Sequence, residues 1–404
     1  MQHVAGIWLV YRLTNSAFML GFTGFVGQIP SFFISPFAGV LADRHNRRRM
    51  LIVVQSLAML QAGVLTFLVL SHQIQVWHII VLNVFLGIVS SFDMTVRQAF
   101  TVEMIEDRED LGNAIALNST MLNSARLIGP AVAGILIVSM GEGICFLINA
   151  VSYIAVLVCL FLMKIPQASI SGAPRNIFLE IKEGFRYAAN FPPIKWMLLI
   201  LALISLMGVS YQILLPVFAR DIFKGGAHTM GFFMTMAGVG ALCGAVFLAA
   251  RKSVVGLPRI IAWTAGLFGF TLMAFACSEQ YWLSMLILLV SGFGMMVHMA
   301  SCNTILQTIA EEDKRGRVMS FYTMSFMGMM PFGSLLAGFL ASKIGAPYTL
   351  FLEGACCLLG SLYFASKLPL IRAHIRPIYI EKGIISEVAK GLESAATLES
   401  MSQD

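Results

Sequence analysis

Three ionisable side chains stand inside long apolar stretches of this sequence, where a charge is expensive and therefore marks a candidate functional group. Arg126 occurs in NSARLIGP, Glu353 in FLEGACC and His298 in GMMVHMASCN. An arginine in such a place can hold an anionic ligand, because its guanidinium offers several donors in a planar fork. A buried carboxyl group can carry a proton, and an imidazole can relay one near neutral pH.

Each of these residues also has a structural alternative, which the sequence leaves open. Arg126 would then be the partner of Asp93 or Asn123. Glu353 would face a water-filled vestibule, and His298 would bond a neighbouring helix, as lone polar residues in membrane bundles often do. The sequence contains no phosphate-binding loop, HExxH pair or nucleophile elbow, so we expect neither an enzyme nor a cofactor or metal site.

The densest charge lies in GVLADRHNRRR, residues 39–49, between two apolar runs. Clustered arginines anchor a loop on the cytoplasmic side of a membrane, which explains the basic residues but not the acid among them. Asp43 ends an apolar run and can face the unpaired N–H groups at the start of another helix.

Composition places the whole chain in a membrane. Of its 404 residues 58% are hydrophobic and only 12% are charged, whereas a soluble domain carries roughly 25% charged residues. The net charge of +6 does not indicate nucleic-acid binding, because most of the 27 lysines and arginines fall at one end of the apolar segments. This bias predicts a multi-pass protein of the cell inner membrane with its C-terminus in the cytoplasm.

The apolar segments predict eleven membrane-spanning helices, each close to the ~20 residues that a bilayer requires. The stretch before them, HVAGIWLVYRLTNS, is only about half a span long at 1.5 Å per residue. We therefore expect this helix to be completed by residues encoded upstream of Met1, the alternative being a protein of eleven spans. The predicted spans cover residues 17–42, 50–70, 76–97, 116–139, 144–163, 194–219, 229–250, 260–277, 281–303, 318–341 and 347–365.

The longest polar interruption divides the chain into two halves, and a chain of two parallel six-helix halves is a known transporter design. Apolar residues spaced from Phe178 to Ala188 predict an amphipathic helix at the membrane surface within this interruption. The predicted units are an N-terminal transmembrane half at 1–163, a cytoplasmic linker at 164–193, a C-terminal transmembrane half at 194–366 and a cytoplasmic tail at 367–404.

The loop at 39–49 resembles the motif that joins helices 2 and 3 in the major facilitator superfamily. Asn46 stands where that family has Gly, and we expect it to keep the left-handed turn. WLVYRLTNS, FDMTVRQAF, EDLGNAIALNSTMLNSARLIGPAVAG and EGFRYAANFPPIKW resemble the subgroup that contains the enterobactin exporter and the macrolide-type efflux proteins. The residues that match the loop motif include Gly39, Asp43, Arg44, Arg47 and Arg48.

This resemblance implies the major facilitator fold, an all-α membrane protein of two six-helix halves, with its first helix truncated in this sequence. It also implies that Asp43 contacts helix 11 of the other half, and an arginine of the loop can pair with Asp93, four residues before Arg97. Such contacts would latch the halves together on the cytoplasmic side in one conformational state and break in the other. Plain anchoring of the loop is the alternative.

GPAVAG, with Gly129, Pro130 and Gly134, resembles the antiporter signature of helix 5, although close helix packing also explains it. We therefore expect a secondary active exporter of a siderophore or an amphiphilic drug that works by proton-coupled antiport. Because the sequence has no ATP-binding loop, an ion gradient or the substrate's own gradient must drive transport. Its partners would be a small-molecule substrate, a proton gradient and membrane lipid, and it would act as a monomer. The alternatives are a lysophospholipid flippase and a non-transporting membrane sensor. The substrate or proton candidates are Arg126, Asn123, His298 and Glu353.

Overall fold

The protein is an all-helical bundle throughout the residues that the structure describes. This computed structural model describes residues 1–103, 111–163, 186–251, 253–312 and 314–385, without the side chains of residues 35–37, 39, 40, 42–44, 98, 99, 101–103, 111–116, 118–120, 122 and 123. Most of the linker helix predicted at 178–188 lies outside the described residues.

Among the described residues six helices precede the linker, and short polar or glycine turns separate several of them. Asn15 ends the first helix in a left-handed conformation with φ 48°, and Ser16 caps the second by accepting a hydrogen bond from the Met19 N–H at 3.4 Å. Gly141, at φ 82°, separates the fifth helix from the sixth. The helices are α1 Gln2–Thr14, α2 Ala17–Arg44, α3 Arg47–Leu70, α4 Val76–Glu103, α5 Leu111–Met140 and α6 Glu142–Leu162.

Two of the predicted spans after the linker are interrupted. Their breaks fall at residues 208–210 and at 328–329. Pro216 and Pro331 follow these breaks, and proline favours such interruptions because it removes a backbone donor and disturbs the preceding turn. The elements are α8 Pro192–Met207, α9 Tyr211–Val217, the π-helix η2 Phe218–Ile222, α10 Ala227–Ala249, α11 Leu257–Ala276, α12 Tyr281–Ile309, α13 Arg315–Met327, α14 Met330–Ile344, α15 Ala346–Ser366 and α16 Leu368–Glu381.

The eleven predicted apolar segments all coincide with helices, so the prediction of an all-α membrane protein is confirmed. Among the described residues, ten helical segments are long and apolar enough to cross a membrane, and Ser124–Met140 of α5 adds a shorter apolar stretch. The observed helices extend beyond several predicted spans at the polar ends, where charged residues continue the helix outside the apolar run.

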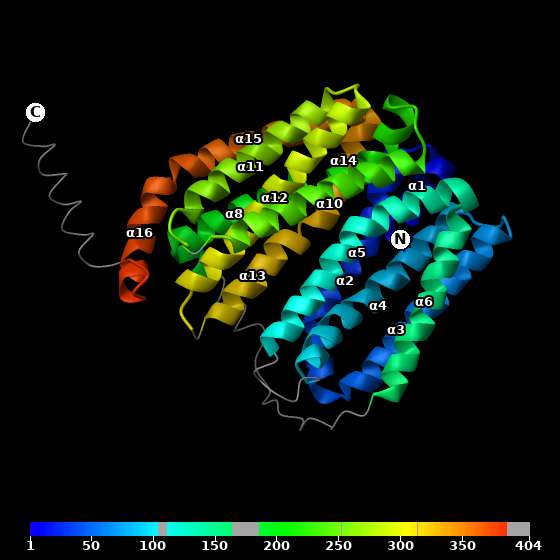
Figure 1. The fold of residues 1–404 in the computed structure, drawn as a ribbon, viewed down its shortest axis with the longest axis horizontal. Coiled ribbons are helices and arrows are strands. Elements are labelled where there is room, and N and C mark those ends of the chain that lie inside the picture. Colours follow the sequence, from blue (N-terminus) through cyan, green and yellow to red (C-terminus); the bar gives the residue numbers. More distant parts are fainter. Residues whose placement is uncertain (104–110, 164–185, 252, 313, 386–404) are drawn as a thin grey trace, which may run out of the picture.

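Helices α1–α6 group on one side of the molecule and α8–α16 on the other (Figure 1). The two groups meet where α2 packs on α14 and α5 packs on α10. The largest cluster of buried apolar side chains includes Leu9 and Phe146 from the first group and Phe218 and Phe275 from the second. We call the end that holds the α2–α3 loop the basic end, and the end that holds the α1–α2 and α14–α15 turns the far end.

Candidate transport pathway

At the far end a polar cluster joins the two halves, and the sequence did not predict it. The Tyr11 hydroxyl of α1 donates a hydrogen bond to the Asp221 carboxylate of η2. Arg220, the neighbouring residue of η2, donates to Asn15 Oδ1 at 2.5 Å, and its guanidinium lies 5.8 Å from the Tyr11 ring centroid. We call Tyr11, Asn15, Arg220 and Asp221 the far-end gate, because they connect α1 to the C-terminal half.

Local structure positions this gate. Asn15 ends α1 in a left-handed conformation, and its side chain accepts the hydrogen bond from Arg220. The wide turn of η2 presents two consecutive charged residues to α1. Tyr11 is buried, whereas Arg220 and Asp221 are exposed. One signal in the sequence pointed here, since Arg220 is among the few basic residues at this end of the spans.

Glycine contacts hold the halves together beside the gate. A Cβ on Gly21 of α2 would lie 2.7 Å from the Gly338 Cα of α14, so neither position accommodates a side chain. On the other flank, a Cβ on Gly134 of α5 would lie 3.2 Å from the Gly231 Cα of α10, and one on Gly231 would lie 2.5 Å from the Pro130 carbonyl oxygen. Pro130 and Gly134 of the helix-5 motif thus lie at the junction between halves.

A polar cavity of about 370 Å³ lies within the N-terminal half and reaches Ile213 of α9. Carboxamide side chains line it and partly bond one another. The Asn149 amide donates to Gln2 Oε1 at 2.5 Å, and the Gln2 amide donates to Gln61 Oε1 at 2.8 Å. Polar residues that line the cavity come from α1, α2, α4 and α6 and include Gln2, Gln28, Asn83, Asn149 and Tyr153. The sequence analysis missed this site because no single carboxamide stands out in its span.

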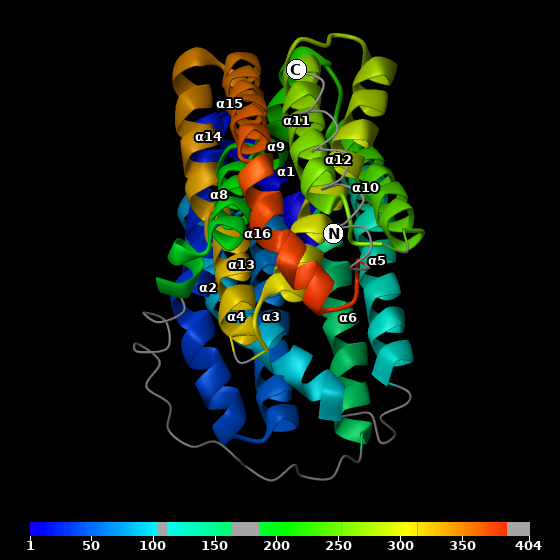
Figure 2. The ribbon, with the colours of Figure 1, turned by 90° about the vertical axis from the view of Figure 1, so that its left-hand side faces the viewer.

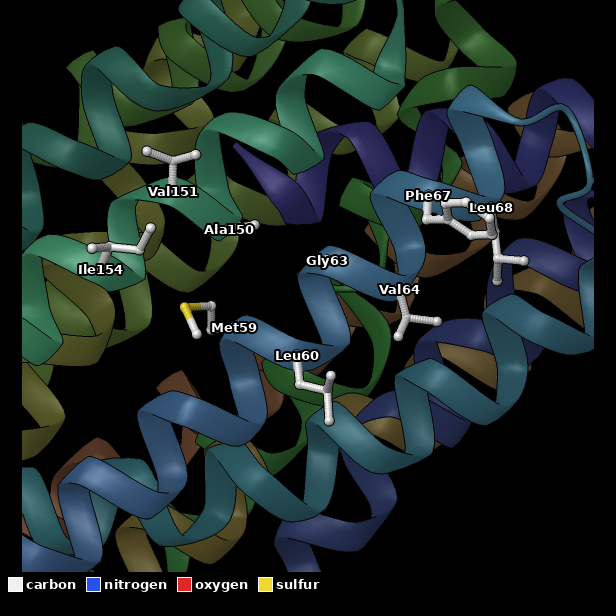
Figure 3. Close-up of a pocket in the computed structure, with 9 residues that line it drawn as sticks. All are labelled: Met59, Leu60, Gly63, Val64, Phe67, Leu68, Ala150, Val151 and Ile154. Atoms are coloured by element: carbon white, nitrogen blue, oxygen red, sulfur yellow. The ribbon is translucent and has the colours of Figure 1, made fainter.

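A second pocket, of about 510 Å³, opens between α3 and α6 and is lined almost entirely by apolar side chains (Figure 3). Because none of its lining side chains donates or accepts a conventional hydrogen bond, it cannot orient a polar substrate. It is lined by Met59, Leu60, Gly63, Val64, Phe67, Leu68, Ala150, Val151 and Ile154.

Arg126 lies on α5 at the interface with α10. Its side chain is exposed, and its carbonyl oxygen lies 3.4 Å from the position of a Cβ on Gly238. No hydrogen bond or ion pair engages its guanidinium within the described part of the chain, and the side chain of its possible partner Asn123 lies outside the described residues. Asp93, the other possible partner, is bonded elsewhere.

Glu353 is buried in α15, with 1% of its surface exposed. The Ser210 hydroxyl, at the break between α8 and α9, donates to its Oε1 at 3.2 Å, while its Oε2 has no partner among the described residues. The backbones of α15 and α11 approach closely here, since a Cβ on Gly354 would lie 2.6 Å from the Gly269 carbonyl oxygen. An unpaired carboxylate away from water is costly, and a proton on the carboxyl group would remove that cost.

His298 of α12 is fully buried and bonds the adjacent helix. Its Nδ1 lies 3.3 Å from the Ile261 carbonyl oxygen of α11, and its Nε2 lies 3.9 Å from Cys302 Sγ. This contact matches the neighbouring-helix bond that the sequence left open beside a relay.

In the loop at the basic end, the backbone conformation of Asn46 differs from the predicted one. Asn46 has φ −64° and ψ 111°, so the expected left-handed conformation was wrong. Asn46 instead caps α3, and its Oδ1 accepts a hydrogen bond from the Arg49 N–H at 3.0 Å, which requires an extended backbone. Arg48 donates to the carbonyl oxygens of Leu160 and Phe161 at 2.7 and 2.8 Å, at the end of α6.

The other residues of the predicted latch lie in the same half. Asp93 binds Arg97 at 2.9 Å and accepts a hydrogen bond from Gln55 Nε2 at 2.5 Å. Arg47 begins α3. The surroundings of three latch residues, Gly39, Asp43 and Arg44, lie outside what the structure describes, so their contact with the other half stays a prediction.

Residues 1–381 match the family described as transmembrane secretion effectors. The chain belongs to this family of the major facilitator superfamily. It is 27% identical to the staphyloferrin A transporter of Staphylococcus aureus, over 89% of this chain and 90% of the relative. It is 21% identical to macrolide efflux protein A of Streptococcus pyogenes, over 87% of each chain.

The fold agrees with this assignment. A solved bacterial homologue of the lysosomal transporter Spinster, in an inward-facing and unoccupied conformation, superimposes with a TM-score of 0.66 at 12% identity, over 94% of this chain and 93% of that one. This chain is therefore a multi-pass membrane transporter and not an enzyme, and its relatives support export.

Proposed function

We propose that this chain exports a siderophore or an amphiphilic drug from the cytoplasm across the cell inner membrane, in exchange for protons. The basic end faces the cytoplasm, because most loop lysines and arginines gather there, and the C-terminus lies on the same side. The chain acts as a monomer, with its two halves alternating around a central pathway.

Alternating access is supported by the far-end gate. The gate and the Gly21–Gly338 contact close the pathway toward the outside. In the opposite state these contacts separate, and the Asp43 loop latches the halves at the cytoplasmic side. Two alternative sets of contacts, each satisfied in one state, provide the bistable element that such transport requires.

The proposal of proton coupling depends on the surroundings of Glu353. This residue is buried, one of its oxygens has no partner in the described part of the chain, and the other accepts a hydrogen bond from Ser210 at a helix break. A break in a spanning helix can move without disrupting a continuous helical ladder. Exchange of a proton at Glu353 would therefore change the contact between α15 and the α8–α9 break.

Arg126 is the proposed contact for an anionic substrate. Its backbone lies where α5 meets α10, between the halves, and its exposed guanidinium has no partner among the described residues. The planar fork suits carboxylate or catecholate oxygens, which can accept two parallel hydrogen bonds. The carboxamides of the polar cavity, Gln28 and Asn83 among them, would receive the uncharged hydrogen-bonding groups of the substrate.

The test is transport in proteoliposomes with an imposed pH gradient. The probes are a carboxylate siderophore and a macrolide, each measured with a pH-sensitive dye inside the vesicles. We expect the wild-type chain to exchange substrate for protons and Glu353→Gln to lose the dependence on the pH gradient. His298→Gln serves as the control, because it alters a buried titratable residue of the same half.

Two results would overturn parts of the proposal. If Glu353→Gln transport still follows the pH gradient, the proton is carried elsewhere. If the wild-type chain moves neither probe, a lysophospholipid in the same assay distinguishes a flippase from a non-transporting sensor.

A further inference from the structure

Two lysines at the basic end are held against aromatic rings where α8, α15 and α16 meet. Lys195 Nζ lies 5.8 Å from the Trp196 ring centroid, and Lys367 Nζ lies 5.5 Å from the same ring. Lys367 Nζ is also 5.0 Å from the Tyr363 ring, whose centroid is 5.4 Å from that of Trp196. We call Lys195, Trp196, Tyr363 and Lys367 the corner cluster.

The fold brings these residues together from distant parts of the chain. Lys195 and Trp196 lie in the first turns of α8, Tyr363 lies in the last turn of α15, and Lys367 connects α15 to α16. Figure 2 shows α16 continuing from the end of α15, and both helices pack against α8.

The positive charge of the corner cluster is not neutralised by the helices that form it. Helix α8 contains no acidic residue, and neither does α13, which packs on it. Glu353 and Glu381 are the acids of α15 and α16, and each is about 20 Å from Lys367 along its helix at 1.5 Å per residue. Glu311, before α13, is already paired with Lys314 at 2.5 Å.

An apolar surface continues from the cluster toward the middle of the bundle. One turn after Lys195, Leu199 is 49% exposed, and two turns before Lys367, Leu359 is 64% exposed. Tryptophan and tyrosine at the end of a span mark the level of the lipid headgroups. A cationic end followed by exposed leucines therefore matches the layout of a phospholipid, with its phosphate at the surface and its acyl chains deeper.

We propose that the corner cluster binds the phosphate of an anionic phospholipid, with Lys195 and Lys367 as the charged contacts and Leu199 and Leu359 against the acyl chains. Cation–π contacts hold both ammonium groups over the ring faces and reduce the freedom that binding would otherwise remove. Basic pockets between helices on the cytoplasmic side are suited to acidic headgroups. A lipid bound at the corner cluster would contact α8 and the α15–α16 junction and hold these three helices together.

The full chain, purified in an uncharged detergent, provides the test. Native mass spectrometry and melting curves are recorded with phosphatidylglycerol and with phosphatidylcholine of the same acyl chains. The test variant is Lys195→Gln with Lys367→Gln. The control is Lys224→Gln with Lys343→Gln, which removes the same charge from two exposed lysines at the far end.

We expect phosphatidylglycerol to bind and stabilise the wild-type and control chains, and phosphatidylcholine to do so less. Loss of both cluster lysines should weaken phosphatidylglycerol binding about thirtyfold, from the usual contribution of each basic residue near a lipid surface. Lys195→Arg with Lys367→Arg keeps the charges and should retain binding, which separates charge from folding. Equal binding of both lipids, or unchanged phosphatidylglycerol binding by the glutamine variant, would overturn the proposal.

Discussion

Removal of one hydroxyl group from the far-end gate should shift the conformational equilibrium of this transporter. Tyr11→Phe deletes the donor to Asp221 and keeps the ring beneath Arg220, so the cation–π contact persists. The substitution therefore isolates a single hydrogen bond between α1 and η2.

The magnitude follows from the setting of this bond. Hydrogen bonds to charged groups contribute about 1.5–3 kcal/mol, and the low end applies because Asp221 is exposed to water. About 1.5 kcal/mol corresponds to roughly a tenfold change in an equilibrium constant. Tyr11→Phe should thus increase the ratio of far-end-open to far-end-closed molecules about tenfold.

Distance measurements between spin labels at the far end provide the assay. Labels at Gln73 and Lys224, both exposed and in different halves, are introduced into a cysteine-free chain. We expect the population with the longer distance to rise in Tyr11→Phe. Tyr348→Phe is the control, because Tyr348 is 72% exposed on α15. Identical distance distributions in the wild-type chain and Tyr11→Phe would refute the role of this bond in closing the far end.

Substitutions at three further positions test the pathway. Gly134→Ala should destabilise the far-end-closed state by about 1–3 kcal/mol, because the added Cβ would lie 2.8 Å from the Ala227 carbonyl oxygen; melting curves check this against Gly129→Ala, whose Cβ meets no atom within 4 Å. Arg126→Lys should weaken and Arg126→Ala nearly abolish export of an anionic siderophore in proteoliposomes without lowering the melting temperature, whereas a less stable alanine variant would indicate a structural role. Asp43→Asn should leave the protein in the membrane and sharply reduce transport, and export at the wild-type rate with equal expression would contradict the latch.

Hydropathy alone predicted the helices because a bilayer leaves few options for an apolar segment of ~20 residues. Hydropathy nevertheless predicts continuous spans at 194–219 and 318–341, and the structure divides both. The first break reflects packing as well as local sequence, since a Cβ on Gly208 would lie 2.8 Å from the Ile204 carbonyl oxygen and the Phe268 ring crowds the same position. The Phe268 contact comes from another helix, α11, so periodicity within one segment does not report it.

The residues of the candidate site could likewise be predicted only in part from the sequence. Glu353, His298 and Arg126 could be selected from the sequence, because an ionisable residue within an apolar run is rare and costly. Their surroundings could not be derived, since Glu353 finds Ser210 143 residues away and His298 faces a backbone carbonyl of a different helix.

By itself the sequence determined that the chain lies in a membrane, where its spans fall, and which end of each span carries the positive charge. These properties depend on residue type and order along one helix, and the bilayer acts on each span separately. Only the tertiary structure decided which residues meet across the halves. Tyr11 and Asp221 are 210 residues apart, and Gly21 and Gly338 come from different halves, so their contacts arise from helix packing that one-dimensional patterns do not encode.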